Sequence, residues 1–266
     1  MITNLALNEQ DKQPISEYTE EIIRLTNLDN KIDRLIYSIT QKLENDRDSM
    51  PAVVFDRYKN IILSVMHPST IKANLREHML EHIDTQKGNR MLNFLKDPLV
   101  SALELLEESA KTLEANQAMQ AFFSNFSSTQ PTKHRKHLIE QLDTVKGSST
   151  IVISTQVELL KSITWGMRNL SEEGQQLTFV QLEKFASNMK GQVTKPIQQQ
   201  VWMRMLFAFK TISDQEMNDA LLLYASDDGE YTVKFIQKAY MSAYTQSVDQ
   251  LQSLLEKSLT YDLTII

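Results

Sequence analysis

The chain has 266 residues, a net charge of −6 and no cysteine, which excludes disulfides, thiolate chemistry and metal sites with cysteine ligands. The acidic balance argues against nucleic acid as the main partner, because neutralising phosphates needs a clustered basic face. Six glycines and six prolines stand against roughly 19 and 13 at average usage, so turns are few and long helices are favoured.

The N-terminal part predicts a short lead followed by three helices. Residues 1–14 are expected to form a flexible lead. From Ser16, apolar residues at helical spacing predict one helix as far as Leu43. Pro51 suits the first turn of a second helix that runs to about residue 66, and Ser69 can cap a third.

The middle of the chain contains the clearest loop. After Gly88 the pattern is helical, with a restart or kink at Asp97-Pro98. The segment "SNFSSTQPTKH" at 124–134 is rich in turn-forming residues and predicts a linker. It separates an N-terminal half, 15–123, from a C-terminal half, 135–266, although one continuous domain is also compatible. The basic cluster "KHRKH" at 133–137 is interpreted as the solvated start of a helix.

The C-terminal half holds one ambiguous segment. Residues 148–160 are rich in β-branched side chains and could form a strand, but their surroundings favour a helix. Thr194 with Pro196 predicts a helix start. The segment 201–210, "VWMRMLFAFK", is apolar on nearly every side, which is typical of a buried helix; a methionine-rich partner surface is the alternative. A capping box at Ser213–Glu216 and a final helix from Asp227 to about Tyr261 complete the chain.

Two stretches of the sequence are nearly the same. "REHMLEHIDTQKG" at 76–88 and "RKHLIEQLDTVKG" at 135–147 agree at seven of thirteen positions, whereas chance would give about one. A fainter third copy is "DALLLYASDDGE" at 219–230. The copies predict a structural repeat of the form helix, joint, helix.

The element common to all three copies is Ser or Thr, two residues, then Gly. The pairs are Thr85 with Gly88, Thr144 with Gly147, and Ser226 with Gly229. A hydroxyl here can accept a hydrogen bond from a backbone N–H two or three residues on and so cap the following helix. The glycine has no side chain, which lets the preceding helix pack close. These six residues are therefore predicted to be structural repeat turns.

The third copy also resembles a known family. Tyr224, Ser226 and Gly229, followed by an amphipathic helix through Phe235 and Tyr240, are similar to the bacterial domain of unknown function family 2059. The resemblance covers about residues 210–260, with weaker echoes in the other two copies. It implies an all-helical, exported protein of Gram-negative bacteria, without assigned activity and without catalytic residues to transfer.

The first copy contains His78-x-x-Glu81-His82, the order of ligands and base in one class of zinc peptidases. On a helix both histidines face one side, and Glu81 could activate a zinc-bound water. The second copy replaces the second histidine with Gln141, so the joint persists where the ligands do not. A third ligand would have to come from unmarked acids such as Glu104, Glu107 or Glu108. The alternative interpretation is two histidines at the border of a half-buried helix face, with metal binding at most adventitious.

The sequence as a whole predicts an all-α multi-helix bundle built from two or three diverged helix-hairpin repeats. Phosphate-binding glycine loops, the Gly-x-Ser-x-Gly elbow and the Rossmann fingerprint are missing from the sequence. The expected function is a non-enzymatic protein-binding or scaffold module of the bacterial envelope, without a cofactor. The alternatives are a zinc-dependent hydrolase using His78, Glu81 and His82, and a cytosolic helical adaptor or secreted effector.

The expected partner is another protein, and the sequence leaves the oligomeric state open. No apolar run approaches the roughly 20 residues of a membrane span, so no transmembrane segment is expected. The N-terminal stretch "MITNLALNEQDKQ" lacks the basic and apolar regions of a signal peptide. A periplasmic location therefore requires a mature chain from which the signal peptide was removed; cytoplasmic and secreted locations are the alternatives.

Overall fold

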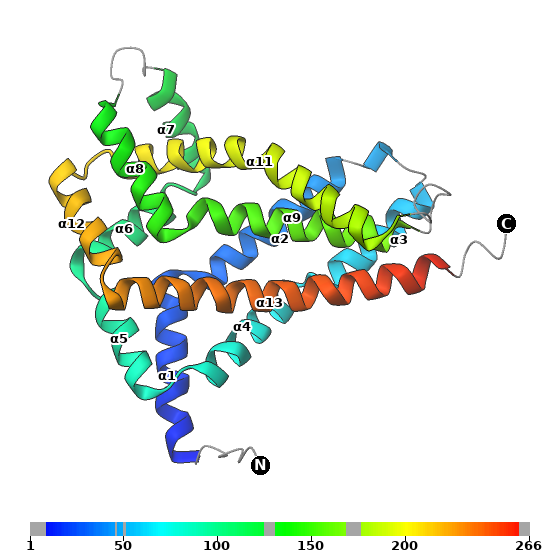
Figure 1. The fold of residues 1–266 in the computed structure, drawn as a ribbon, viewed down its shortest axis with the longest axis horizontal. Coiled ribbons are helices and arrows are strands. Elements are labelled where there is room, and N and C mark those ends of the chain that lie inside the picture. The colour runs from blue at the N-terminus through cyan, green and yellow to red at the C-terminus, as the bar shows by residue number, and fades with distance from the viewer. Residues whose placement is uncertain (1–8, 46, 50–51, 125–130, 169–176, 261–266) are drawn as a thin grey trace. The chain divides into compact units, whose positions relative to one another are not determined.

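The computed structural model describes residues 9–45, 47–49, 52–124, 131–168 and 177–260, and every regular element among them is a helix (Figure 1). This confirms the predicted all-α class. None of the described helices is long and apolar enough to cross a membrane. The elements are α1 Glu9–Thr26, α2 Leu28–Asn45, a 3-10 turn η1 Arg47–Ser49, α3 Ala52–Val65, α4 Pro68–His82, α5 Thr85–Leu95, α6 Pro98–Ser109, α7 Leu113–Ser124, α8 Lys133–Lys146, α9 Ser148–Gly166, α11 Phe179–Ala208, α12 Asp214–Tyr224 and α13 Asp227–Thr260.

The helices divide into two compact units, each assembled from three separate stretches of the chain. The first unit takes residues 1–28, 76–148 and 199–237, and the second takes 29–75, 149–198 and 238–266. The expected halves, 15–123 and 135–266, coincide with neither unit. The expected linker, 124–134, falls inside the middle stretch of the first unit, and 125–130 lie outside the described residues.

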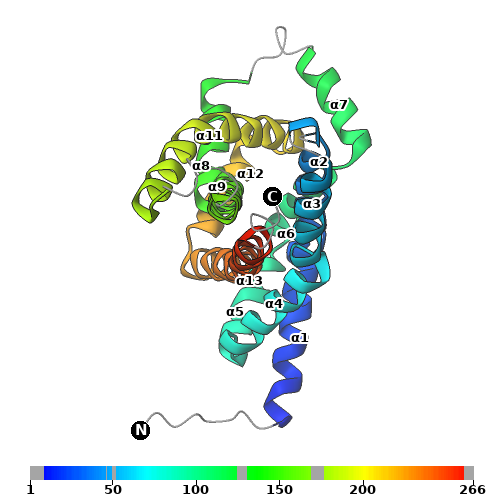
Figure 2. The same ribbon diagram turned by 90° about the vertical axis from the view of Figure 1, so that its right-hand side faces the viewer.

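The first unit is built on two groups of packed helices. α1 packs against α5 and α6, and both views show α1 beside α5 (Figure 1, Figure 2). α12 packs against α8 and α6. Because α6 belongs to both groups, it is the element on which the unit is organised. The buried side chains of the first unit on these five helices include Ile22, Ile23, Met91, Leu103, Leu138, Leu142, Met217 and Ala220.

The second unit contains α2, α3, α9 and the larger parts of α11 and α13. Its core includes Ile32, Phe55, Ile62, Ile153, Tyr244 and Leu251. The buried Tyr244 hydroxyl donates to the Thr155 carbonyl at 2.9 Å, which joins α13 to α9. A Cβ on Gly166 would lie 2.6 Å from the Cβ of Leu255, so the same two helices approach closely at that glycine.

The helix predicted from Ser16 to Leu43 is in fact two helices. Asn27 separates α1 from α2 with a left-handed φ of 54°, a conformation that asparagine tolerates better than most residues. The Thr26 hydroxyl donates to the Ile22 carbonyl at 2.6 Å at the end of α1. The predicted lead is also shorter than expected, because residues 9–14 belong to α1; residues 1–8 lie outside the described residues.

Two further helix starts differ from the prediction. α11 begins at Phe179 and runs through Pro196, whereas Thr194 donates to the Lys190 carbonyl inside that helix. Ile197, directly after the proline, is buried, and this burial opposes part of the cost of about 3 kcal/mol that an internal proline carries. At α4, His67 rather than Ser69 takes the capping role: its Nδ1 accepts from the Ser69 N–H at 3.3 Å.

Several local predictions are confirmed. The ambiguous segment after residue 148 is helix α9. Asp97 caps α6 directly before Pro98, Ser213 and Glu216 form the predicted capping box of α12, and α13 begins at Asp227. The break between α6 and α7 was not predicted. In 201–210, Met205, Phe207 and Phe209 are buried but Met203 is 38% exposed, so the segment is only partly buried.

Candidate functional site

The joint at Ser226 has the predicted geometry. The Ser226 hydroxyl accepts from the Gly229 N–H at 3.1 Å, which caps α13, and donates to the Leu223 carbonyl at 2.7 Å. A Cβ on Gly229 would lie 2.3 Å from the Leu223 carbonyl oxygen and 2.8 Å from that of Tyr224. The last turn of α12 therefore packs directly on the glycine.

The joint at Thr85 is built differently. The cap of α5 is Asp84, whose carboxylate accepts from the Lys87 N–H at 2.8 Å, while Thr85 is the exposed first residue of the helix. Gly88 is needed for another contact, since a Cβ there would lie 2.7 Å from the Tyr18 ring on α1. The prediction of a Thr85 cap is wrong, because a carboxylate one residue earlier satisfies the same backbone donors.

The joint at Thr144 has a third geometry. Thr144 lies inside α8 and donates to the Glu140 carbonyl at 2.8 Å, so it caps nothing. Gly147 ends α8 with a left-handed φ of 62°, and its N–H donates to the Asp143 carbonyl at 2.7 Å. The same four-residue pattern thus occurs in three different local structures, and the predicted cap is present only at Ser226.

The two histidines of the predicted metal motif stack on each other. The rings of His78 and His82 have centroids 4.2 Å apart and planes inclined by 19°, and the His82 Nδ1 lies 2.8 Å from the His78 carbonyl oxygen. A metal bound by imidazole lies in the ring plane, and two nearly parallel rings at this distance offer no common point for it. Glu81 is exposed. The described residues contain no group of three or more His, Cys, Asp or Glu side chains placed to hold a metal ion.

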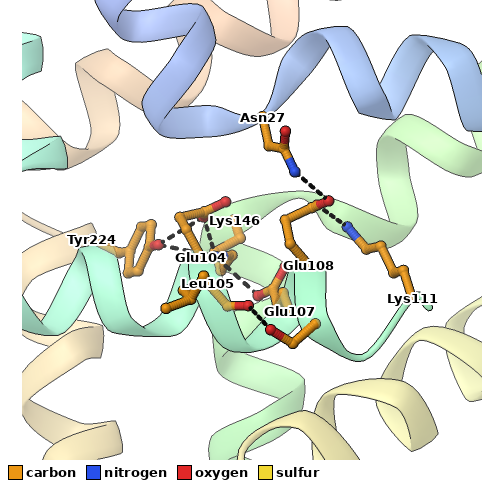
Figure 3. Close-up of polar contacts among 9 residues, drawn as sticks. Asn27, Glu104, Leu105, Glu107, Glu108, Lys111, Lys146 and Tyr224 are labelled. Atoms are coloured by element: carbon orange, nitrogen blue, oxygen red, sulfur yellow. Dashed lines mark hydrogen bonds and ion pairs between the residues drawn. The ribbon is translucent and has the colours of Figure 1, made fainter. Parts of the chain in front are cut away.

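The acids suggested as a third ligand belong to a separate cluster around Lys146 (Figure 3). Lys146 is the last residue of α8, and it is buried. Its Nζ donates to Glu104 Oε1 at 2.5 Å and to the Tyr224 hydroxyl at 2.9 Å, and it lies 2.9 Å from Glu107 Oε1. The Tyr224 hydroxyl donates in turn to Glu104 at 3.2 Å. The lysine therefore joins α8 to α6 and α12.

The electrostatics of this cluster indicate a structural role. Burial lowers the pKa of Lys146, but the charges of Glu104 and Glu107 outweigh that effect and hold the pKa well above its ordinary value. Burial raises the pKa of Tyr224. Lysine stays charged and the phenol stays neutral at physiological pH, whereas a catalytic lysine needs a lowered pKa. The cluster is an ion-pair network that holds three helices together.

A second layer ties this network to α1. Glu108 on α6 accepts from the Asn27 side-chain amide at 2.8 Å and from Lys111 Nζ at 2.6 Å (Figure 3). Asn27 is the left-handed residue that ends α1. Neither layer was apparent from the sequence, because acids on an amphipathic helix are ordinary.

Helix α7 has an apolar stripe without a complete cover. Seven of its twelve residues are apolar, yet none is buried. Ala115, Met119, Phe122 and Phe123 lie at helical spacing and are half-buried, and Leu113 is 72% exposed. The Phe122 ring meets that of Phe207 edge-on, with centroids 5.7 Å apart. A helix that serves only the fold normally buries its apolar stripe, so this one is open to a further contact.

The comparisons with known proteins assign no family. Neither protein-family models, nor curated proteins, nor solved structures match the chain. The similarity to family 2059 therefore rests on the Tyr224, Ser226 and Gly229 motif alone and stays a hypothesis.

Proposed function

We propose that the chain is a non-enzymatic helical module that binds another protein through α7, and that it works in the bacterial envelope. The observation that carries the binding role is the half-exposed stripe of Ala115, Met119, Phe122 and Phe123 on a helix without a single buried residue. Interfaces of this kind bury an amphipathic helix face against a partner. The envelope location is supported by the resemblance at residues 210–260.

The polar clusters support this reading more than a hydrolytic one. In the Lys146 network one lysine is held in the cationic form between two carboxylates, and the His78 and His82 rings face each other. Both are arrangements that stabilise a helical protein.

The proposal is tested by site-specific crosslinking in the cells that naturally make the protein. A photo-crosslinking residue replaces Gln120, which is exposed on α7. We expect covalent adducts with a defined protein, recovered in the periplasmic fraction. Added wild-type protein without the crosslinker should compete for the partner and lower the yield of adducts. The double variant Met119→Ser/Phe123→Ser should not lower it, because this variant lacks the apolar contact.

The matched control places the same photo-crosslinking residue at Leu222, which is 73% exposed on α12 of the same unit. Adducts of equal yield from both positions, or competition by the double variant as strong as by the wild type, would contradict binding through α7. Specific adducts in the cytoplasmic fraction would keep the binding role and favour the cytosolic adaptor; adducts in the medium would favour the secreted effector.

A further inference from the structure

The start of α8 carries two exposed lysines beside two exposed histidines, of which His137 lies 4.0 Å from Glu140. Lys133, His134, Lys136 and His137 are exposed, and the first turn of the helix contains no acid. Within the part of the chain that the structure describes, no ion pair is recorded for Lys133 or Lys136. Cations at a helix N-terminus are unfavourable because they face the positive end of the helix dipole. In a chain of net charge −6, this local surplus of cations fits an anionic partner.

The stripe of α7 and the start of α8 both contact residues 207–210, at and directly after the end of α11. Phe122 of α7 contacts the Phe207 ring, and Lys210 Nζ lies 4.1 Å from the centroid of that same ring. Two residues along, the Phe209 carbonyl accepts a hydrogen bond from Arg135 of α8, which also pairs with Asp214 at 2.8 Å. Residues 207–210 thus contact both features, and Lys210 lies beside the same ring that Phe122 of the stripe contacts.

We propose, building on the protein-binding function above, that α7 and the first turns of α8 form one docking surface for an acidic amphipathic helix of the partner. Apolar side chains of that helix would lie on Met119, Phe122 and Phe123, and its carboxylates would face Lys133 and Lys136. The exposed positions of α7 are Leu113, which is apolar and 72% exposed, and a series of polar or small residues that includes Gln117 and Gln120. A helix that inserts into a bilayer presents large apolar side chains along its whole exposed face, so the surface suits a protein helix better than a lipid surface.

The test compares two synthetic amphipathic peptides of about 18 residues, a length that favours helix formation. Both carry leucine at identical positions; one has glutamate and the other lysine on its polar face. Binding to the full chain is measured by fluorescence anisotropy. We expect the glutamate peptide to bind at least tenfold more tightly than the lysine peptide, and we expect added salt to weaken the binding of the glutamate peptide. A preference set by net charge alone would be the opposite, because the chain is acidic overall.

The deciding variant is Lys133→Glu/Lys136→Glu, which should remove the preference for the glutamate peptide. Its control, Lys190→Glu/Lys195→Glu, makes the same change of charge at two exposed lysines of α11 and should keep it. Equal binding of the two peptides, no binding of the glutamate peptide, or an unchanged preference in the Lys133/Lys136 variant would overturn the proposal. Vesicles of phosphatidylglycerol that bind only the chain with both lysines intact would assign the surface to lipid and overturn it as well.

The outcome separates this proposal from the function on which it rests. If crosslinking from Gln120 finds a partner but the charge reversal changes nothing, α7 is a protein-binding helix and its partner is not acidic. If crosslinking from Gln120 gives no specific adduct, protein binding through α7 fails whatever the peptides do.

Discussion

Replacing Lys146 with methionine should lower the free energy of unfolding by about 3–5 kcal/mol, the cost of leaving buried charges without their counter-ion. Methionine fills a similar volume, so the loss measures the charge. Glu104 and Glu107 would stay largely enclosed in the first unit, where the Tyr224 hydroxyl donates to Glu104. Urea unfolding at neutral pH, followed by circular dichroism, gives the difference.

The Lys146 prediction has an internal control in the matching residue of the first copy. Lys87 pairs with Asp84 at 2.9 Å, but both side chains are largely exposed, so Lys87→Met should cost less than about 1 kcal/mol. The triple variant Lys146→Met/Glu104→Gln/Glu107→Gln should regain part of the free energy of unfolding that Lys146→Met loses, because neither carboxylate is then left without a cation. A Lys146→Met loss as small as that of Lys87→Met would contradict the buried network.

The same network sets the response to alkaline pH. Because the pKa of Lys146 is raised in the folded protein, its stabilisation is complete below the ordinary value of 10.5 and is lost as pH rises through the higher folded value. The difference in the free energy of unfolding between the wild type and Lys146→Met should therefore be constant near neutral pH. It should decrease only in strongly alkaline solution.

Replacing Gly229 with alanine should cost about 3 kcal/mol and lower the melting temperature by about 6–12 °C. The new Cβ would lie 2.3 Å and 2.8 Å from two backbone oxygens at the end of α12. Backbone atoms cannot rotate away as a side chain can, so α12 and α13 must separate. Differential scanning calorimetry measures the shift.

Gly191 provides the matched control for this substitution. It lies inside α11, and no atom stands within 4 Å of the position that its Cβ would take. Alanine at 191 should stabilise the protein by about 0.5–1 kcal/mol, since alanine is the better helix former. Equal effects at 191 and 229 would show that close packing is not the reason for the glycine at 229.

The sequence predicted the fold class and those helix ends that have a local cause. Asp97 before Pro98, and Ser213 with Glu216, were found because a cap depends on a few neighbouring residues. The break at Asn27 and the uninterrupted helix through Pro196 were not found. At Asn27 a single left-handed residue interrupts an unbroken apolar pattern, and at Pro196 the helix continues against the local preference, with Ile197 buried directly after the proline.

The joints show why a repeated motif did not give a repeated geometry. Gly88 meets Tyr18 on α1, Gly147 lies against Gln237 on α13, and Gly229 meets its own preceding helix. The first two contacts join residues far apart in sequence, which local patterns do not encode. Lys87 and Lys146 are likewise matched in the sequence, but one is in solvent and the other in the core.

The Lys146 network also restricts the order in which these positions can change during evolution. One cation faces two carboxylates, so Glu107→Gln can come first, since it leaves a balanced pair with Glu104. A lineage that loses Lys146 first must pass through a protein with two largely enclosed acids that have lost their cation. Substitutions at positions 104 and 146 should therefore occur together in descendants of this chain, whereas position 107 can change before them and position 87 can change without them.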